Sequence, residues 1–124
     1  MKDLIYRNEA YEIIGKCMEV HTELGQGFLE IVYKDALEKV FFEDGIYFER
    51  EKKYEVKFRN EILKHLFYAD FVVLDNIILE IKCVSTLTDE HMAQCINYLK
   101  VSGNKLALLV NFGRGKLEYK RIVY

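Results

Sequence analysis

Apolar residues recur at helical spacing in the first third of the chain. Between residues 6 and 24 they follow each other at steps of three and four, which predicts an amphipathic helix. Its inward stripe comprises Ala10, Ile13, Ile14, Cys17, Met18, His21 and Leu24. The segment GQG at 25–27 breaks the pattern, and a second helix is expected over about residues 28–44, with Gly45 at its C-terminal cap. Its predicted inward residues are Leu29, Val32, Ala36, Leu37, Val40 and Phe41.

After the second helix the pattern becomes strand-like. Residues 47–58, 62–74 and 77–84 read as three strands, and RNE at 59–61 is a turn between the first two. The charges in the first strand indicate one solvated face or a sheet edge.

The last third of the chain returns to a helix and then to strands. Thr88 is an N-cap candidate with two acids in the turn that follows, and Gly103 is a stop signal, which together predict a third helix. Residues 105–112 are nearly all apolar, as in a strand covered on both faces, and 117–124 form a final strand. The pattern therefore predicts an α/β protein, with residues 1–124 as one domain.

Charged residues interrupt the apolar hairpin formed by the second and third strands. Side chains alternate across a strand, so two sets are expected to share the core face. The first set is Phe67, Ala69, Phe71 and Val73, and the second is Leu79, Ile81 and Cys83. Pairing these faces requires an odd-length loop, because a slip of one residue inverts every side chain.

A three-residue loop, Leu74-Asp75-Asn76, meets that requirement if Asn76 adopts the left-handed conformation. It places Asp70 directly opposite Glu80, with Lys82 two residues further along on the same face. Two facing carboxylates repel each other, but they become favourable around a divalent cation. A neighbouring lysine could stabilise developing negative charge or orient a water molecule. From the spacing alone, an exposed face on which Lys82 screens the two acids is the favoured interpretation.

Composition limits the classes of function. The net charge of −2 and the pI near 5.9 do not support a broad nucleic-acid-binding surface, although a local basic groove is compatible with them. The three cysteines match no metal-binding spacing, which favours free thiols in the cytoplasm. No signal peptide or membrane-spanning stretch is predicted, so we expect no membrane partner. His21 reads as a core residue, and NFGRGK at 111–116 as a turn rather than a phosphate-binding loop.

Five short motifs occur together in order: VHTELGQG, GFLEIVY, the D…ExK hairpin, QCINYL and VNFG. In GFLEIVY, the residues Gly27, Glu30 and Tyr33 have the spacing G-x-x-E-x-x-Y. Over about residues 13–121 the chain resembles the GxxExxY protein family, which is assigned to the PD-(D/E)xK nuclease superfamily. The resemblance implies a restriction-endonuclease-like core, with a mixed central sheet of about five strands flanked by three helices.

The resemblance also implies roles at particular positions. Asp70 and Glu80 match metal ligands, and the backbone carbonyl of Ile81 would be a further ligand. Glu30 matches a glutamate that binds metal directly or through water. Lys82 matches the lysine that orients or activates water and stabilises charge. For Glu30 the residue pattern alone favours a different role, an acid that complements the helix dipole.

Gln94 and Tyr98 match a Q-x-x-x-Y pattern on the third predicted helix, where residues four apart share a face. They are candidates for a catalytic role, with structural hydrogen bonds at the edge of the apolar stripe as the alternative. Tyr68 departs from the family pattern, because many members carry a basic residue two positions before the acid. Contacts with the substrate backbone are therefore not carried over.

The function implied is a Mg²⁺-dependent phosphodiesterase that hydrolyses nucleic acid through metal-activated water. The candidate ligands are all oxygen atoms, which favours Mg²⁺ over Zn²⁺, with Mn²⁺ as a substitute. The alternative is a catalytically silent nuclease-fold protein that binds nucleic acid or a protein partner, and a metal-free α/β domain is a third reading. A homodimer is compatible with the sequence, because two sites would suit a duplex.

Overall fold

The computed structural model describes residues 4–124. Its elements, in chain order, are α1 (Arg7–Leu24), α2 (Glu30–Glu43), β1 (Phe48–Phe58), β2 (Glu61–Val73), β3 (Ile77–Lys82), α3 (Asp89–Ser102), β4 (Leu106–Asn111) and β5 (Glu118–Val123). The predicted order of helices and strands is thus confirmed. No helix in this part of the chain has the length and apolar character needed to cross a membrane.

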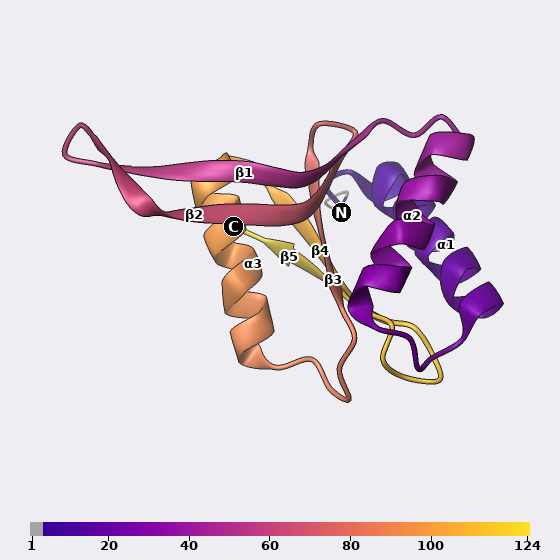
Figure 1. The fold of residues 1–124 in the computed structure, drawn as a ribbon. Helices are drawn as coiled ribbons and strands as arrows, with labels where there is room; N and C mark the ends of the chain where they lie inside the picture. The colour runs from indigo at the N-terminus through magenta and orange to yellow at the C-terminus, as the bar shows by residue number, and fades with distance from the viewer. Residues whose placement is uncertain (1–3) are drawn as a thin grey trace.

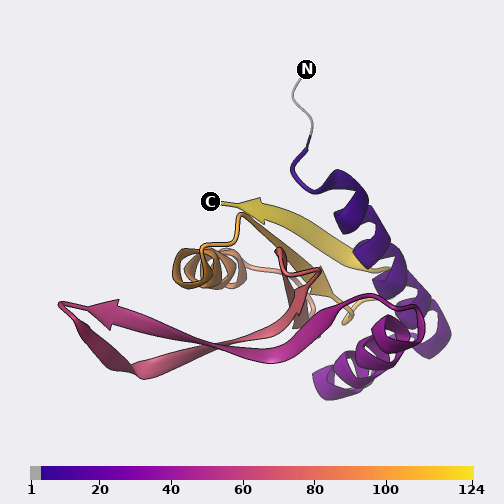
Figure 2. The same ribbon diagram turned by 90° about the horizontal axis from the view of Figure 1, so that it is seen from above.

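The five strands form one mixed sheet in the order β1-β2-β3-β4-β5. Only the β3–β4 pair is parallel, as expected for two strands joined through a helix. Helices α1 and α2 cover one face of the sheet, and α3 covers the other (Figures 1 and 2). Every residue of β4 is buried, and β1 lies at an edge, as the sequence pattern predicts. The fold is therefore α/β with a restriction-endonuclease-like arrangement.

Two inward positions predicted for the first helices are wrong. Leu29 is the N-cap of α2 and is 76% exposed, because the helix begins only at Glu30. Met18 is exposed on α1, where Val20 is buried in its place. The true start of α2 sets which side chains face the sheet, and the buried ones are Tyr33, Lys34, Leu37 and Phe41.

The β2–β3 hairpin has the predicted register. Phe71 pairs with Leu79 and Val73 with Ile77, which leaves a three-residue loop. The left-handed residues are Leu74 (φ 55°) and Asp75 (φ 62°), so the assignment of this conformation to Asn76 is wrong. Two successive positive φ angles turn the chain tightly enough for the Asn76 N–H to donate to the Val73 carbonyl at 3.2 Å.

The predicted common face of β2 is also wrong in one respect. Phe71 and Val73 pack with α1 and α2, whereas Phe67 and Ala69 pack with α3. The alternation breaks at Asp70, which lies between the pairs Arg50–Phe71 and Lys52–Ala69 of the β1–β2 ladder. The intervening β1 residue, Glu51, has a φ of 53°. Both faces of the sheet are consequently apolar, and Asp70 lies where β2 changes face.

The VNFG motif joins the end of β4 to the segment after β3. The Asn111 side chain is buried; its Oδ1 accepts from the Val84 and Gly113 N–H groups at 3.0 and 2.9 Å, and its Nδ2 donates to the Val84 carbonyl at 2.9 Å. The His21 ring packs against Phe112 at a tilt of 56°, and its Nε2 donates to the Arg114 carbonyl at 2.8 Å. The prediction that His21 is a satisfied core residue is confirmed.

Gly113 provides a first testable prediction. A Cβ at this position would lie 2.4 Å from the Val84 carbonyl oxygen, so Gly113→Ala forces the backbone to shift. We expect a loss of about 2–3 kcal/mol in the free energy of unfolding, measured by urea denaturation. Gly15→Ala is the control, because its Cβ meets nothing within 4 Å in the middle of α1, where alanine is favoured by about 0.5–1 kcal/mol. Equal effects of the two substitutions would show that the Gly113 turn adjusts freely.

Candidate functional site

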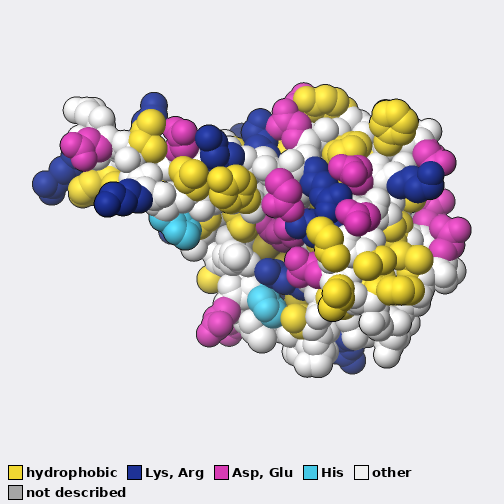
Figure 3. Space-filling model, viewed as in Figure 1, with side chains coloured by type: hydrophobic (Ala, Val, Ile, Leu, Met, Phe, Trp, Pro, Cys, Tyr) yellow, Lys and Arg dark blue, Asp and Glu magenta, His cyan; other side chains and the backbone are white. Residues whose placement is uncertain are grey.

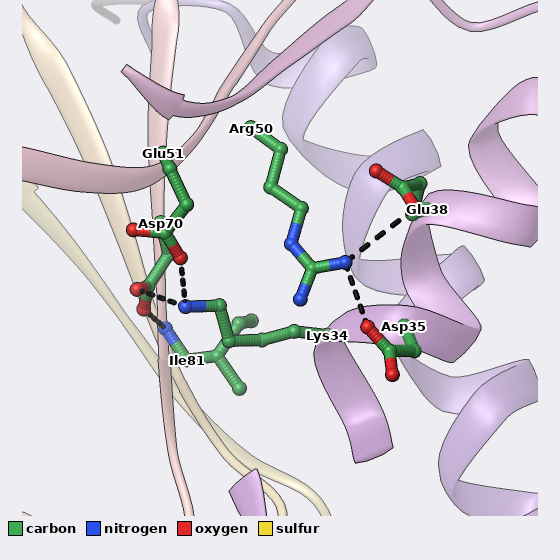
Figure 4. Close-up of polar contacts among 7 residues, drawn as sticks. All are labelled: Lys34, Asp35, Glu38, Arg50, Glu51, Asp70 and Ile81. Atoms are coloured by element: carbon green, nitrogen blue, oxygen red, sulfur yellow. Dashed lines mark hydrogen bonds and ion pairs between the residues drawn. The ribbon is translucent and has the colours of Figure 1, made fainter. Parts of the chain in front are cut away.

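Both carboxylate oxygens of Asp70 have partners. Oδ1 accepts from the Lys34 ammonium at 2.9 Å, and Oδ2 accepts from the Ile81 N–H at 2.8 Å (Figure 4). The β2–β3 ladder ends at the Phe71–Leu79 pair, so the Asp70 side chain supplies the acceptor that a paired strand would otherwise provide. The Asp70 side chain therefore links β2 to β3 just beyond the last backbone pair of the two strands.

The Ile81 carbonyl lies on the same side of β3 as Asp70. The Lys82 carbonyl accepts from the Phe112 N–H and so faces β4. Successive residues of a strand direct their backbone groups to opposite neighbours, so the Ile81 carbonyl faces β2. Its own N–H already meets Asp70 on that side. The carbonyl implied as a metal ligand is thus beside the first acid.

Glu80 is a buried acid with one carboxylate oxygen that has no partner among the described residues. Its side chain lies between the sheet and α3 with 3% of the residue exposed, and Oε1 is the oxygen concerned. Burial, and then the neighbouring Asp70 side chain, raise the pKa of Glu80 well above its usual value. An unpartnered buried acceptor is costly, and a second carboxylate nearby adds repulsion. A cation between Asp70 and Glu80 would remove both costs.

Lys82 lies two residues after Glu80 and projects from the same face of β3. Its Nζ donates to Gln94 Oε1 of α3 at 3.0 Å, so the helix holds the amine in place. Tyr98, one turn further along α3, is buried and contacts Phe67 edge to face, with ring centroids 5.8 Å apart. Burial, and then Glu80 and Asp70, raise the pKa of Tyr98. Burial and Glu80 likewise raise the pKa of Cys95 to about 12. This face of α3 therefore lies over the acids.

Glu30 is the first residue of α2 and is half-buried. Burial, and then the Asp70 carboxylate, raise its pKa, while Lys82 and Lys34 lower it. Glu30 therefore shares the electrostatic environment of Asp70, Lys34 and Lys82. Within residues 4–124, however, no three His, Cys, Asp or Glu side chains come close enough together to hold a metal ion. Glu30 thus does not form one ligand set with Asp70 and Glu80 in this structure.

Lys34 is the residue of this region that sequence reasoning missed. Its side chain is 8% exposed, and its Nζ contacts both Asp70 and Glu51 (Figure 4). Burial lowers the pKa of Lys34, but the bonds to Glu51 and Asp70 outweigh burial and raise it. The sequence does carry a signal for it. Lys34 lies three residues before Leu37 and seven before Phe41, which places it on the inward stripe of α2. A polar residue at such a position needs a partner.

A second basic side chain, Arg50 of β1, forms ion pairs with α2 next to Lys34, Glu51 and Asp70. The Arg50 guanidinium lies 2.8 Å from Asp35 and 3.5 Å from Glu38 (Figure 4). Glu51, the next residue of β1, is held by Lys34. These contacts fix the edge strand against α2, and they position the Glu51 carboxylate near Asp70.

The residues present fit a hard cation. Asp70, Glu80 and the Ile81 carbonyl offer oxygen atoms only, which suit Mg²⁺ or Mn²⁺. Glu80 Oε1, which lacks a partner in the described part of the chain, is the particular acceptor that such an ion would satisfy. The Lys34 ammonium is the positive charge already in contact with Asp70.

Comparisons with known proteins agree with this arrangement. The model of the PD-(D/E)XK nuclease superfamily matches residues 7–122. No curated protein matches the chain significantly. Among solved structures, "Crystal structure of SSO0001" is similar with 19% sequence identity and a TM-score of 0.63, over 95% of this chain. The chain spans 59% of that protein, and at this identity the likeness shows the fold alone.

Proposed function

The chain belongs to the PD-(D/E)XK nuclease superfamily, and from that premise we propose that it is a metal-dependent phosphodiesterase that hydrolyses nucleic acid. The observation that carries the proposal is the buried Oε1 of Glu80, near Asp70, which has no partner within residues 4–124. Lys82 follows on the same strand with its amine held by Gln94. We propose that these two acids and the amine act together near the point where the β2–β3 ladder ends.

We further propose membership of the GxxExxY family, because its motif has a structural role here. The Tyr33 hydroxyl donates to the Gly25 carbonyl at 2.6 Å and accepts from the Phe28 N–H at 3.3 Å. Gly27 has a φ of 112°, which side-chain-bearing residues rarely adopt. Tyrosine and glycine together shape the loop from which α2 starts, and this loop sets the position of Glu30.

In the proposed reaction, Asp70, Glu80 and the Ile81 carbonyl would hold Mg²⁺, or Mn²⁺ as a substitute, and Glu30 would bind it directly or through water. When bound, the ion neutralises charge on the phosphoryl group and makes water a better nucleophile. Lys82 orients the attacking water and stabilises the negative charge that develops. Gln94 positions Lys82, and Tyr98 with its apolar neighbours excludes bulk water from Glu80. We place the reaction in the cytoplasm, where the free cysteines stay reduced.

One observation favours the second candidate, a silent nuclease-fold protein that binds nucleic acid or a protein partner. The Lys34 ammonium contacts Asp70 Oδ1, and the Ile81 N–H donates to Oδ2, so both oxygens of a proposed metal ligand already have partners. If Lys34 stays there, the acids serve as a structural ion-pair network and no hydrolysis follows. The two candidates therefore differ in whether a cation can displace Lys34 from Asp70.

The decisive experiment is a cleavage panel of single-stranded, duplex and branched DNA and of RNA, with Mg²⁺, Mn²⁺ or EDTA. Cleavage is expected only with metal, and Asp70→Ala and Lys82→Ala should each abolish it. Lys120→Ala, on the exposed part of β5, is the control and should leave cleavage unchanged. Cleavage that survives both site substitutions would come from a contaminant and would end the enzymatic proposal.

A further inference from the structure

Strands β1 and β2 continue past the rest of the protein as a projecting hairpin (Figures 1 and 2). We call residues 55–66 the arm. Helix α3 covers the base of the hairpin, where Tyr54 and Phe67 pack in the same apolar cluster as Tyr98. Within the arm every residue is exposed except Val56 and Leu66, which are half-buried. Neither strand needs this length for the fold, because the apolar clusters include no residue of the arm.

The arm combines cations with exposed apolar side chains. It carries Lys57, Arg59 and Lys64 against Glu55 and Glu61, so it is positive in a chain whose net charge is −2. Phe58 and Ile62 are each 56% exposed. Along the projecting segment, Lys and Arg side chains lie among hydrophobic ones (Figure 3). Cations that meet phosphates, with apolar groups that meet sugars and bases, are typical of nucleic-acid contacts.

The tip of the arm presents an arginine at an energetic cost. Phe58 pairs with Glu61, so the turn consists of Arg59 and Asn60, with φ angles of 49° and 67°. Two positive φ angles define the type I′ hairpin turn, which asparagine and glycine favour. Arginine in the left-handed conformation costs about 1–2 kcal/mol. The Arg59 guanidinium lies 5.0 Å from the Phe58 ring centroid. The left-handed backbone of Arg59 costs folding free energy, so the presence of an arginine at this position points to a role other than stabilising the fold.

The arm is continuous with the candidate site. The same two strands carry Glu51 and Asp70, and the tip at Arg59 and Asn60 lies eight or nine residues after Glu51 on β1. At the rise of an extended strand this distance is roughly 25–30 Å. That length corresponds to about eight base pairs of a duplex. A two-stranded ribbon is also narrow enough to enter the major groove.

We propose that the arm binds duplex DNA and leads it to the acids at the base of the hairpin. This inference deepens the proposed function and rests on it for the substrate class. Lys57, Arg59 and Lys64 contact phosphates, and Phe58 contacts the groove. The arm thereby supplies the binding surface that the acidic body of the protein lacks.

Binding is tested by fluorescence anisotropy with a labelled duplex of about 20 base pairs in EDTA, over a series of salt concentrations. The triple variant Lys57→Gln, Arg59→Asn, Lys64→Gln should weaken binding by about tenfold or more. Its log–log salt slope should fall by roughly 2–3, since each phosphate contact contributes about 0.9. The control triple, Lys39→Gln, Lys105→Gln, Lys120→Gln, removes the same charge from exposed positions on the body and should change affinity by less than about twofold.

Melting temperatures and the molar mass in solution of each variant separate lost DNA binding from lost folding and from lost dimerisation. Arg59→Asn should melt no lower than wild type, because asparagine suits the left-handed turn, so lost binding is not lost folding. The proposal would be overturned if the two triple variants lost DNA affinity equally. It would also be overturned if the arm triple bound DNA as tightly as wild type, or if wild type did not bind DNA. A dimer that becomes a monomer in the arm triple with DNA binding intact would assign the arm to a second copy, and would also overturn it. Wild type that binds through the arm yet cleaves no nucleic acid would overturn only the hydrolytic function.

Discussion

Replacement of Glu80 by glutamine is expected to abolish metal-dependent cleavage and yet leave the metal-free protein at least as stable as wild type near pH 8. Glutamine keeps the size of the side chain and removes the charge that burial penalises. Its amide can also donate a hydrogen bond toward Asp70. As a ligand, however, glutamine lacks the negative charge that a cation needs here. The loss of cleavage should exceed the roughly 10–100-fold typical of groups that merely support a metal ligand.

The pH dependence of stability fixes the sign of this prediction. The pKa of Glu80 is raised in the folded protein, so between the unfolded value near 4.5 and the folded value the folded chain holds a proton that the unfolded chain releases. Wild type therefore loses stability as pH rises through this window. Glu80→Gln has no proton to lose, so its free energy of unfolding relative to wild type should increase from about pH 4 to about pH 8.

Urea denaturation in EDTA at several pH values measures this difference. Glu12→Gln, at an exposed position of α1, is the control and should follow wild type throughout. A Glu80→Gln protein that is less stable than wild type near pH 8 would show that the Glu80 charge is paired in the folded state. Full cleavage by this variant would remove Glu80 from the proposed ligand set.

The register of the β2–β3 hairpin follows from local sequence. The alternation of apolar residues on β2 and β3 selects a three-residue loop, and that loop sets the register of the pairs up to Phe71–Leu79, although the ladder ends before the expected Asp70–Glu80 pair. This inference works because strand periodicity is a property of adjacent residues. It failed at Phe67 and Ala69, where a left-handed Glu51 on the partner strand accompanies a change of face. No pattern within β2 encodes the backbone angle of a residue in β1.

Lys34 and Gln94 show the other limit of sequence reasoning. Lys34 meets acids 17 and 36 residues later in the chain, and Gln94 meets Lys82 across the gap between α3 and the sheet. A helical pattern can indicate that a lysine faces inward, but its partners depend on tertiary packing. The resemblance to a family supplied Gln94 as a candidate, and the structure supplied the contact through which it acts.

Replacement of Lys34 by methionine is expected to give the largest loss of stability among the site variants in EDTA. Removing one member of a buried ion pair typically costs about 3–5 kcal/mol, because the other charge stays buried and unpaired. Lys34 and Asp70 are both largely buried, while the Glu51 side chain is about half exposed. We therefore expect the low end of that range, roughly 3 kcal/mol, by urea denaturation. Lys39→Met, on the same helix but 75% exposed, should cost less than about 0.5 kcal/mol.

Mn²⁺ should reverse much of this loss, because the variant frees Asp70 Oδ1 and removes the positive charge that contacts Asp70 and Glu51. The rise in melting temperature on adding Mn²⁺ is therefore expected to be larger for Lys34→Met than for wild type. Lys82→Met removes the same charge without freeing an Asp70 oxygen and should show a smaller gain, while Lys34→Arg should resemble wild type. If Mn²⁺ stabilises Lys34→Met no more than wild type, lysine and metal ion do not share Asp70. The acids would then form an ion-pair network with Lys34 alone, which is the chemistry of the silent alternative rather than of a nuclease.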